Sequence, residues 1–423
     1  MSEKKTAIDT TGYFLYKELY PDFSTILKGE QIEMPVFCKS ALFVLDTNSL
    51  LVPYLVGAKG LAEIKRIFET LLASNSIYVA SHTLREFAKN RSLKISELYT
   101  EIDKALSQLP SIKDFNYPIL SDMADYQTLL ECKKEIAGSV SKYKKTLQDL
   151  QKGINGWNWF DPVTSLYSNI FTNTNIVDNN ESEAELIADF ILRMEKGIPP
   201  GNKDQAKPEN AIGDYLIWKS ILSLSKSNGK DIVFVTNDEK NDWMLKGNKK
   251  SISTRFELVD EFFRETGKHF ACLNFADFLE IHGALEEVVT EVESKVVEQD
   301  IKVLNNNVFN NLNRITNIVK RFLSYANTTN QDDDVFIEDS EFHTIAREFT
   351  NSWERALDER PHLEALKHEF YNLDDILSKI ISLNAEISYQ AVRMKRSTYN
   401  HQKELVSRCR EFLNTMETVS IVL

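Results

Sequence analysis

The chain has 423 residues, of which 42% are hydrophobic and 27% charged, values that fit two or three folded domains and exclude a disordered or fibrous protein. Its 50 Lys and Arg residues against 63 Asp and Glu residues give a formal net charge of −13. This charge argues against a protein that coats a polyanion along its whole surface, but it allows local basic surfaces.

Five short apolar segments predict the strands of a parallel sheet. They are rich in β-branched and aromatic residues, and stretches with helical periodicity lie between them. Buried strands that alternate with helices predict an α/β fold in which helices cover both faces of the sheet. The five segments are residues 41–46, 76–81, 175–178, 231–236 and 269–275, and 175–178 has the weakest signal.

The stretch between the second and third predicted strands is too long for a simple crossover, and it predicts a helical hairpin inserted at about 88–170. Two apolar stripes with three- and four-residue spacing mark its helices, and Pro110 ends the first one. The first stripe is Leu84, Phe87, Ile95, Leu98, Ile102, Leu106 and Leu109, and the second is Leu129, Ile136, Val140, Tyr143, Leu147 and Leu150.

Three aromatic residues follow the second stripe, in a segment where Gly and Pro end the helical pattern. Trp157, Trp159 and Phe160 either stack on nucleic-acid bases or seat the loop on the core. The second role is the commoner one for such residues, and we expect it here.

After about residue 280 the strand signal ends and helical periodicity continues. An apolar stripe predicts a long helix over 285–323, and a polar, acidic stretch at 327–341 predicts a linker before further helices. The long helix either forms a dimer seam or packs within the chain, so a homo-oligomer and a regulatory protein partner both stay open. The predicted organisation is an N-terminal extension at 1–40, an α/β domain at 41–280 and a helical domain at 281–423.

Several functional classes lack their signals in this sequence. No apolar run reaches the roughly 18 residues of a membrane span, and the first residues lack the apolar core of a signal peptide, so we expect a cytoplasmic protein without membrane contact. The four cysteines form no CxxC pair, which argues against a zinc site or a disulfide framework. A GxxxxGK[ST] loop and a nucleophile elbow are missing too, which argues against nucleotide hydrolysis and acyl transfer.

Acidic residues follow the predicted strands at the points where those strands end. Asp46 ends the first strand, Glu86 lies in the helix after the second, and Asp238 follows the fourth. Asp214 lies in the first turns of a further predicted helix. Because ligands of an open parallel sheet bind at the carboxyl ends of its strands, we expect these four carboxylates to converge. Their mutual repulsion requires a cation, and Mg²⁺ or Mn²⁺ suits a site of oxygen ligands and supports phosphate-ester hydrolysis.

Several short motifs follow one another along the chain, namely LDTN at 45–48, PPGNKD at 199–204, NAIGD at 210–214, TND at 236–238 and DW at 242–243. Their order resembles that of PIN-domain nucleases, over roughly residues 41–275. The resemblance implies a three-layer α/β/α domain that hydrolyses RNA with Mg²⁺ or Mn²⁺. It also implies that the catalytic and metal-holding residues are Asp46, Glu86, Asp214 and Asp238. The large helical hairpin and the helical C-terminal third depart from the minimal family pattern, so the resemblance does not give the RNA target.

Four further polar residues lie beside the candidate acids. Asn48 and Thr236 either hydrogen-bond a metal-bound water, orient Asp46 or only satisfy backbone groups at the strand ends. Asp242 lies one helical turn beyond Asp238 and is the alternative fourth acid, although Asp238 is nearer to the strand end. The resemblance implies that Asp204 orders a loop beside the site.

Basic residues gather next to the candidate acids although the whole chain is acidic. The runs at 85–94 and 240–255 each contain several Lys and Arg residues and a single acid. They either form a rim that binds the nucleic-acid backbone or are an ordinary solvated surface. The candidate contacts are Arg85, Arg91, Lys203, Lys207, Lys240 and Lys249.

The sequence therefore predicts a Mg²⁺- or Mn²⁺-dependent endoribonuclease. Analogy with fused nuclease and helical modules of bacterial toxin and antiphage systems leaves a conditionally activated effector open. The main alternative is an inactive PIN-like scaffold whose helical region mediates assembly. A haloacid-dehalogenase-like phosphatase is a weaker alternative, because its DxD signature needs an acid where this chain has Asn48.

Overall fold

The computed structural model describes residues 15–20, 26, 33–111, 116–179, 181–201, 212–237, 242–247, 250–326, 337, 341–358, 367–393 and 399–422. The chain divides into two compact units, Met1–Glu293 and Ser294–Leu423, and each is described by itself. The domain boundaries expected at residues 40 and 280 stay predictions.

A five-stranded parallel sheet forms the centre of the first unit, as the five apolar segments predict. The strand order is β3-β2-β1-β4-β7, and each neighbouring pair is parallel. Leu45 of the central strand lies opposite Val79 and Val235, so three adjacent strands end at the same level. The strands are β1 (Leu42–Leu45), β2 (Ile77–Ala80), β3 (Ile176–Val177), β4 (Ile232–Val235) and β7 (Phe270–Leu273).

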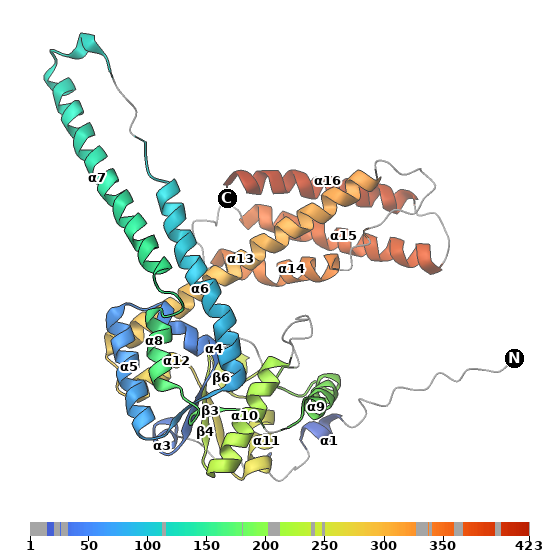
Figure 1. Ribbon diagram of the computed structural model, residues 1–423. Helices are drawn as coiled ribbons and strands as arrows, with labels where there is room; N and C mark the ends of the chain where they lie inside the picture. The colour runs from blue at the N-terminus through green and yellow to red at the C-terminus, as the bar shows by residue number, and fades with distance from the viewer. Residues whose placement is uncertain are drawn as a thin grey trace. The chain divides into compact units, whose positions relative to one another are not determined.

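Helices cover both faces of this sheet, which confirms the predicted α/β/α layers (Figure 1). On one face, Phe43 of β1 contacts Phe278 of α12, which in turn packs against Phe68 of α5. On the other face, Val44 shares a buried cluster with Trp218 of α10 and with residues of α11. Neighbouring residues of a strand point to opposite faces, so β1 is buried by both layers. The helices are α5 (Ala58–Ala73), α8 (Pro162–Ile170), α9 (Glu183–Lys196), α10 (Gly213–Asn228), α11 (Phe256–Thr266) and α12 (Phe275–Ile281).

Short elements complete the first unit, and one of them was not predicted. An antiparallel pair, β5 (Met244–Gly247) and β6 (Lys250–Thr254), lies between β4 and α11. Its sequence is rich in Lys, Ser and Asn and lacks a clear apolar alternation, which explains the omission. The other short elements are α1 (Leu15–Leu19), α3 (Met34–Phe37), α4 (Thr47–Leu51), η1 (Val52–Tyr54) and η2 (Pro118–Leu120).

The predicted helical hairpin consists of α6 (Ser81–Ser107) and α7 (Ala124–Asn155). Figure 1 shows α7 extending away from the sheet. Leu147 of α7 is buried near the base, whereas much of the predicted apolar stripe is exposed. The exposed members are Leu98, Leu129, Ile136, Tyr143 and Leu150. The pattern therefore predicted the helices correctly but overstated how much of them is packed.

The second unit is helical, as predicted, and the division between the units falls within α13. Val308, Ile315 and Ile318 of α13 are buried in a cluster with residues of the three following helices. This part of the long stripe is therefore explained by packing within the unit. Most of the predicted linker at 327–341 lies outside the described residues, but the backbone of Ile337 is bound by the side-chain amide of Asn384. The helices are α13 (Glu286–Ala326), α14 (Phe342–Asp358), α15 (Lys367–Arg393) and α16 (Tyr399–Val422).

Within the part of the chain that the structure describes, no helix is both long and apolar enough to cross a membrane.

Candidate functional site

Asp46 stands at the carboxyl end of β1 and forms the N-cap of α4. Its side chain is only 7% exposed and accepts three hydrogen bonds. The donors are the backbone N–H of Thr47 at 2.7 Å, the amide of Asn48 at 2.8 Å and the hydroxyl of Thr236 at 2.6 Å. A buried carboxylate held by donors from two adjacent strands has one fixed orientation.

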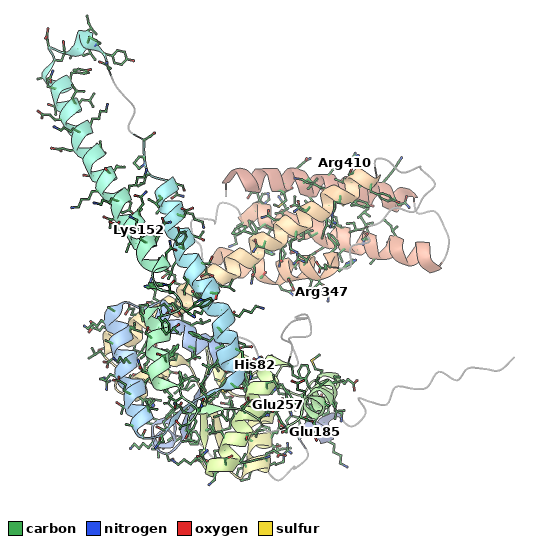
Figure 2. The ribbon with its side chains drawn as sticks, viewed as in Figure 1. His82, Lys152, Glu185, Glu257, Arg347 and Arg410 are labelled. Carbon is green, nitrogen blue, oxygen red and sulfur yellow. The ribbon has the colours of Figure 1, made fainter. Side chains whose placement is uncertain are left out.

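Thr47 connects this strand end to the second candidate acid. Its hydroxyl donates to Oε2 of Glu86 at 2.5 Å, while its backbone N–H donates to Asp46. The other carboxylate oxygen of Glu86 lies 3.4 Å from Nε2 of His82, one turn earlier on α6. Figure 2 shows His82 at the start of that helix. The structure therefore brings Asp46 and Glu86 together through a residue that the sequence analysis did not single out.

Asn48 and Thr236 donate to Asp46, in keeping with the orienting role that was one of the alternatives for them, and Asn48 also satisfies a backbone N–H. The Asn48 amide donates to Asp46 and to the Thr236 hydroxyl, while its carbonyl oxygen accepts from the backbone N–H of Asn237 at 2.9 Å. Asn237 was missed by the sequence analysis, and its side-chain oxygen accepts from the N–H of Phe275 at 2.9 Å. Together these contacts tie the ends of β1, β4 and β7 into one network.

Asp214 lies in the first turn of α10, the helix that packs against α6 and the strands β2 and β3. This is the position that the sequence predicted for it. Across the described residues, however, no three His, Cys, Asp or Glu side chains form a group that could hold a metal ion. The donors that do come together, two carboxylates and neighbouring hydroxyls, are oxygen ligands of the kind that Mg²⁺ and Mn²⁺ prefer.

Several predicted site residues cannot be placed. Six of them lie outside the described residues, namely Asp204, Lys203, Lys207, Asp238, Lys240 and Lys249. The alternative fourth acid, Asp242, is described and fully buried beside Trp243. The hydrogen bonds that the Arg255 guanidinium donates to the Glu257 carboxylate raise the pKa of Arg255, and the negative charge of Asp242 adds to this effect. Asp242 is thus a buried carboxylate whose charge acts on Arg255.

Of the described basic candidates, one remains at the surface and one does not. Arg85 is largely exposed on α6 and lies 3.8 Å from the carboxylate of Asp178. Arg91 is 6% exposed, and its guanidinium donates to Asp161 at 2.7 Å and to the carbonyl oxygen of Trp159 at 2.6 Å. The prediction that Arg91 contacts a phosphate is therefore corrected, because a buried carboxylate and a backbone carbonyl already engage its donors.

The family assignment rests on a comparison with known protein families. A family profile described as PIN like domain matches residues 42–258, more than half of the chain. The chain belongs to the PIN-like domain family. The matched segment contains Asp46, Glu86 and the residues that donate to them, Thr47, Asn48 and Thr236. The family is of nuclease type, with nucleic acid as substrate and divalent metals as usual cofactors. No curated protein and no solved structure matches the chain significantly.

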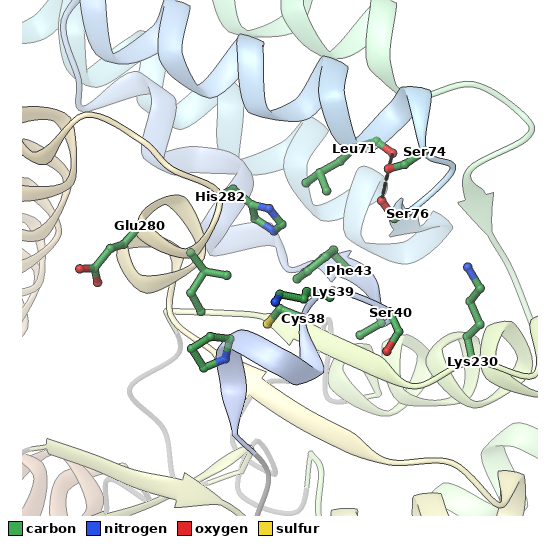
Figure 3. Close-up of a pocket in the computed structure, with 13 residues that line it drawn as sticks. Cys38, Lys39, Ser40, Phe43, Leu71, Ser74, Ser76, Lys230, Glu280 and His282 are labelled. Atoms are coloured by element: carbon green, nitrogen blue, oxygen red, sulfur yellow. Dashed lines mark hydrogen bonds between the residues drawn. The ribbon is translucent and has the colours of Figure 1, made fainter.

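A cavity lies at the other end of the PIN-like sheet, where the parallel strands begin. Figure 3 shows this cavity of about 700 Å³, which is lined by Cys38, Lys39, Phe43, Lys230 and His282 among others. Burial lowers the pKa of His282 and raises that of Cys38 to about 11. None of the candidate acids lines this cavity. The hydrogen-bonded acids and the hollow therefore occupy opposite ends of the sheet.

Proposed function

We propose that this PIN-like protein is a Mg²⁺- or Mn²⁺-dependent endoribonuclease whose centre lies at the carboxyl ends of β1, β2 and β4. The observation that carries the proposal is the pairing of two buried or half-buried acids that follow different strands, Asp46 after β1 and Glu86 after β2. The Thr47 backbone donates to Asp46 and its side chain donates to Glu86, so a single residue sets the positions of both carboxylates. Membership of a nuclease-type family supports hydrolysis of nucleic acid as the reaction.

Each residue of the network has a proposed role. Asp46, Glu86, Asp214 and Asp238 would hold the cation, which when bound would neutralise their charges and polarise the scissile phosphate. Thr236 and Asn48 keep the carboxylate of Asp46 turned toward the strand ends. His82 lies against Glu86 and fixes the direction of its side chain.

RNA is the proposed substrate because the resembled nucleases mostly cut RNA. Arg85, and the lysines at 203, 207, 240 and 249, are the proposed contacts to the phosphate backbone. Arg91 no longer belongs to this set, because Asp161 and Trp159 engage its guanidinium.

A phosphatase of the haloacid-dehalogenase type is disfavoured by the contacts of Asn48. That family needs an acid at this position, whereas here the Asn48 amide donates to Asp46 and to the Thr236 hydroxyl. Turnover of p-nitrophenyl phosphate by the wild-type chain, lost in Asp46→Asn, would be the result that favours a phosphatase over a nuclease.

The deciding experiment compares cleavage and metal uptake in the same preparation. Labelled single-stranded RNA and DNA of one sequence are incubated with the full chain in Mn²⁺ or in EDTA. We expect cleavage of the RNA in Mn²⁺, none in EDTA, and none by Asp46→Asn. Calorimetric titration with Mn²⁺ then tests the inactive-scaffold alternative, since a scaffold would bind no Mn²⁺ in a manner that depends on Asp46.

A further inference from the structure

Two large aromatic side chains are displayed to solvent between α7 and α8. Trp159 is 68% exposed and Phe160 is 71% exposed, although the sequence led us to expect these residues in the core. The expectation was wrong for these two residues, which lie exposed in the segment that joins α7 to α8. Aromatic surface that stays in water contributes no hydrophobic stabilisation to the fold, and exposed apolar patches often mark binding sites.

The segment is held in place by a buried carboxylate directly after the two aromatics. Asp161 is fully buried and accepts from the hydroxyl of Tyr54 at 2.8 Å, from Arg91 at 2.7 Å and from the N–H of Thr164 at 3.0 Å. It also caps the N-terminus of α8 through Val163. Burial alone would raise the pKa of Asp161, but these hydrogen bonds outweigh burial and lower it. The carboxylate is therefore ionised at neutral pH and anchors the segment firmly.

Arg91 fixes the indole itself. Its guanidinium carbon lies 4.8 Å from the centre of the Trp159 ring, and one of its N–H groups donates to the Trp159 carbonyl. The Trp159 backbone has a φ of +73°, a region that bulky L residues rarely adopt and that persists only where the surroundings impose it. One face of the indole thus lies on a cation, while the rest of the ring stays exposed. The indole is therefore a preorganised stacking surface.

The aromatic pair stands close to the candidate acids along the chain's rigid elements. Arg91 follows Glu86 by five residues on α6, a rise of about 7.5 Å along the helix. Tyr54, which binds the anchoring Asp161, belongs to η1, the element that follows α4, and its ring stacks on that of Phe87. The anchor of the aromatic pair therefore contacts α6, which carries Glu86, and η1, which follows the helix that Asp46 caps.

We propose that Trp159 and Phe160 form a stacking platform for unpaired bases of a single-stranded nucleic-acid substrate. The inference rests on the proposed nuclease function and adds a binding site for the substrate strand, outside the candidate acids. Aromatic rings stack on bases of any sequence, and Arg beneath the ring strengthens the stack. Bases of a duplex are already stacked on each other, so a duplex gains nothing from this surface.

The test measures binding separately from cleavage. The full chain carrying Asp46→Asn, which keeps the substrate intact, is titrated with a labelled unstructured RNA oligonucleotide and with the matching RNA duplex, and the Kd is read by fluorescence anisotropy. We expect Phe160→Ala and Trp159→Ala each to weaken single-strand binding by roughly 5- to 100-fold and duplex binding by less than about twofold. Trp159→Phe should recover most of the loss, because it keeps an aromatic face.

Two controls make the result decisive. Tyr143→Ala removes an exposed aromatic ring from α7, away from the anchor, and should leave single-strand binding unchanged. Phe160→Ala keeps every hydrogen bond of Asp161, so it tests the platform even if Trp159→Ala disturbs the fold. Unchanged single-strand affinity in folded Phe160→Ala and Trp159→Ala, or an equal loss with duplex, would overturn the platform.

The outcome also separates this inference from the proposed function. If the wild-type chain cleaves RNA but the alanine variants bind and cleave like it, the platform alone fails. If the chain cleaves nothing yet binds single strands through Trp159 and Phe160, the platform stands and the catalytic proposal fails.

Discussion

The two ends of β1 differ in what surrounds them, with hydrogen-bonded acids at one end and a cavity at the other. At the carboxyl end, Asp46 is enclosed by donors from Thr47, Asn48 and Thr236. At the amino end, Phe43 lines a cavity of about 700 Å³ (Figure 3). Ser74 and Ser76 also line it, and their hydroxyls bond each other and a backbone carbonyl. We therefore take the oriented carboxylate pair, and not the cavity, as the mark of the end of the sheet that is suited to hydrolysis.

The largest expected effect comes from removing the charge at the ordered end. Asp46→Asn should lower the rate of RNA cleavage by roughly 10³-fold, because one negative ligand of the cation is lost. Asn is also a good N-cap, so α4 should keep its start and the melting temperature should change little. Initial rates on labelled RNA, beside thermal denaturation, check both statements.

A matched variant at the opposite end sharpens this result. Asp231 precedes β4, and its carboxylate accepts from the backbone N–H of His269 at 2.9 Å. Asp231→Asn keeps an acceptor there and should leave cleavage within about twofold of wild type. Equal losses in both variants would mean that the two ends do not differ in function.

The second effect tests the other linked acid. Glu86→Gln keeps an oxygen that can accept from the Thr47 hydroxyl but loses the negative charge, so we expect cleavage to fall by roughly 10²-fold. Glu280→Gln, which changes an acid that lines the cavity, is the control and should have little effect. A Glu86→Gln enzyme with wild-type initial rates would remove Glu86 from the proposed centre.

A smaller effect is expected from the hydroxyl that orients Asp46. Thr236→Val has nearly the same shape but loses the donor to Asp46, and hydrogen bonds to charged groups contribute about 1.5–3 kcal/mol. We expect cleavage to fall by about tenfold, while Thr236→Ser, which keeps the hydroxyl, should stay near wild type. The affinity for Mn²⁺ should weaken in parallel, and a stability loss without either change would make Thr236 purely structural.

The sequence predicted the sheet well because its strands are buried on both faces. Segments such as IVFV in β4 leave no alternative to a parallel central strand, and the helices of the C-terminal region follow from regular apolar spacing. The β5–β6 pair escaped because it is short and polar, so its pairing depends on tertiary context.

The parts of the candidate site that the sequence predicted are acids that stand at or near strand ends. The parts that it did not predict depend on contacts between residues far apart along the chain. Asp46 and Glu86 are acids at element boundaries, so their positions could be inferred. The bridge through Thr47 and the burial of Arg91 depend on residues 39 and 70 positions away along the chain, and no local pattern encodes them. The exposure of Trp159 likewise follows from the anchor at Asp161, which only the folded chain assembles.

The smallest expected effect concerns the amino end and depends on pH. His282 lies edge-on to Phe43 and Phe278 with ring centroids 4.7 and 4.9 Å away, and burial lowers its pKa. As the pH falls through the ordinary value near 6.5, the unfolded chain takes up a proton at this residue that the folded chain does not, so stability is lost toward acid. His282→Gln has no such proton uptake, and its melting temperature should therefore fall less than that of wild type between pH 7.5 and 5.5, by a difference on the order of 2 °C.

Cleavage at pH 7.5 should be the same in both proteins, because His282 lies at the end of the sheet that holds none of the candidate acids. Equal falls in the melting temperatures of the two proteins would show that His282 takes up its proton alike in the folded and unfolded chains. A loss of cleavage in His282→Gln would show that the two ends of β1 are coupled in function.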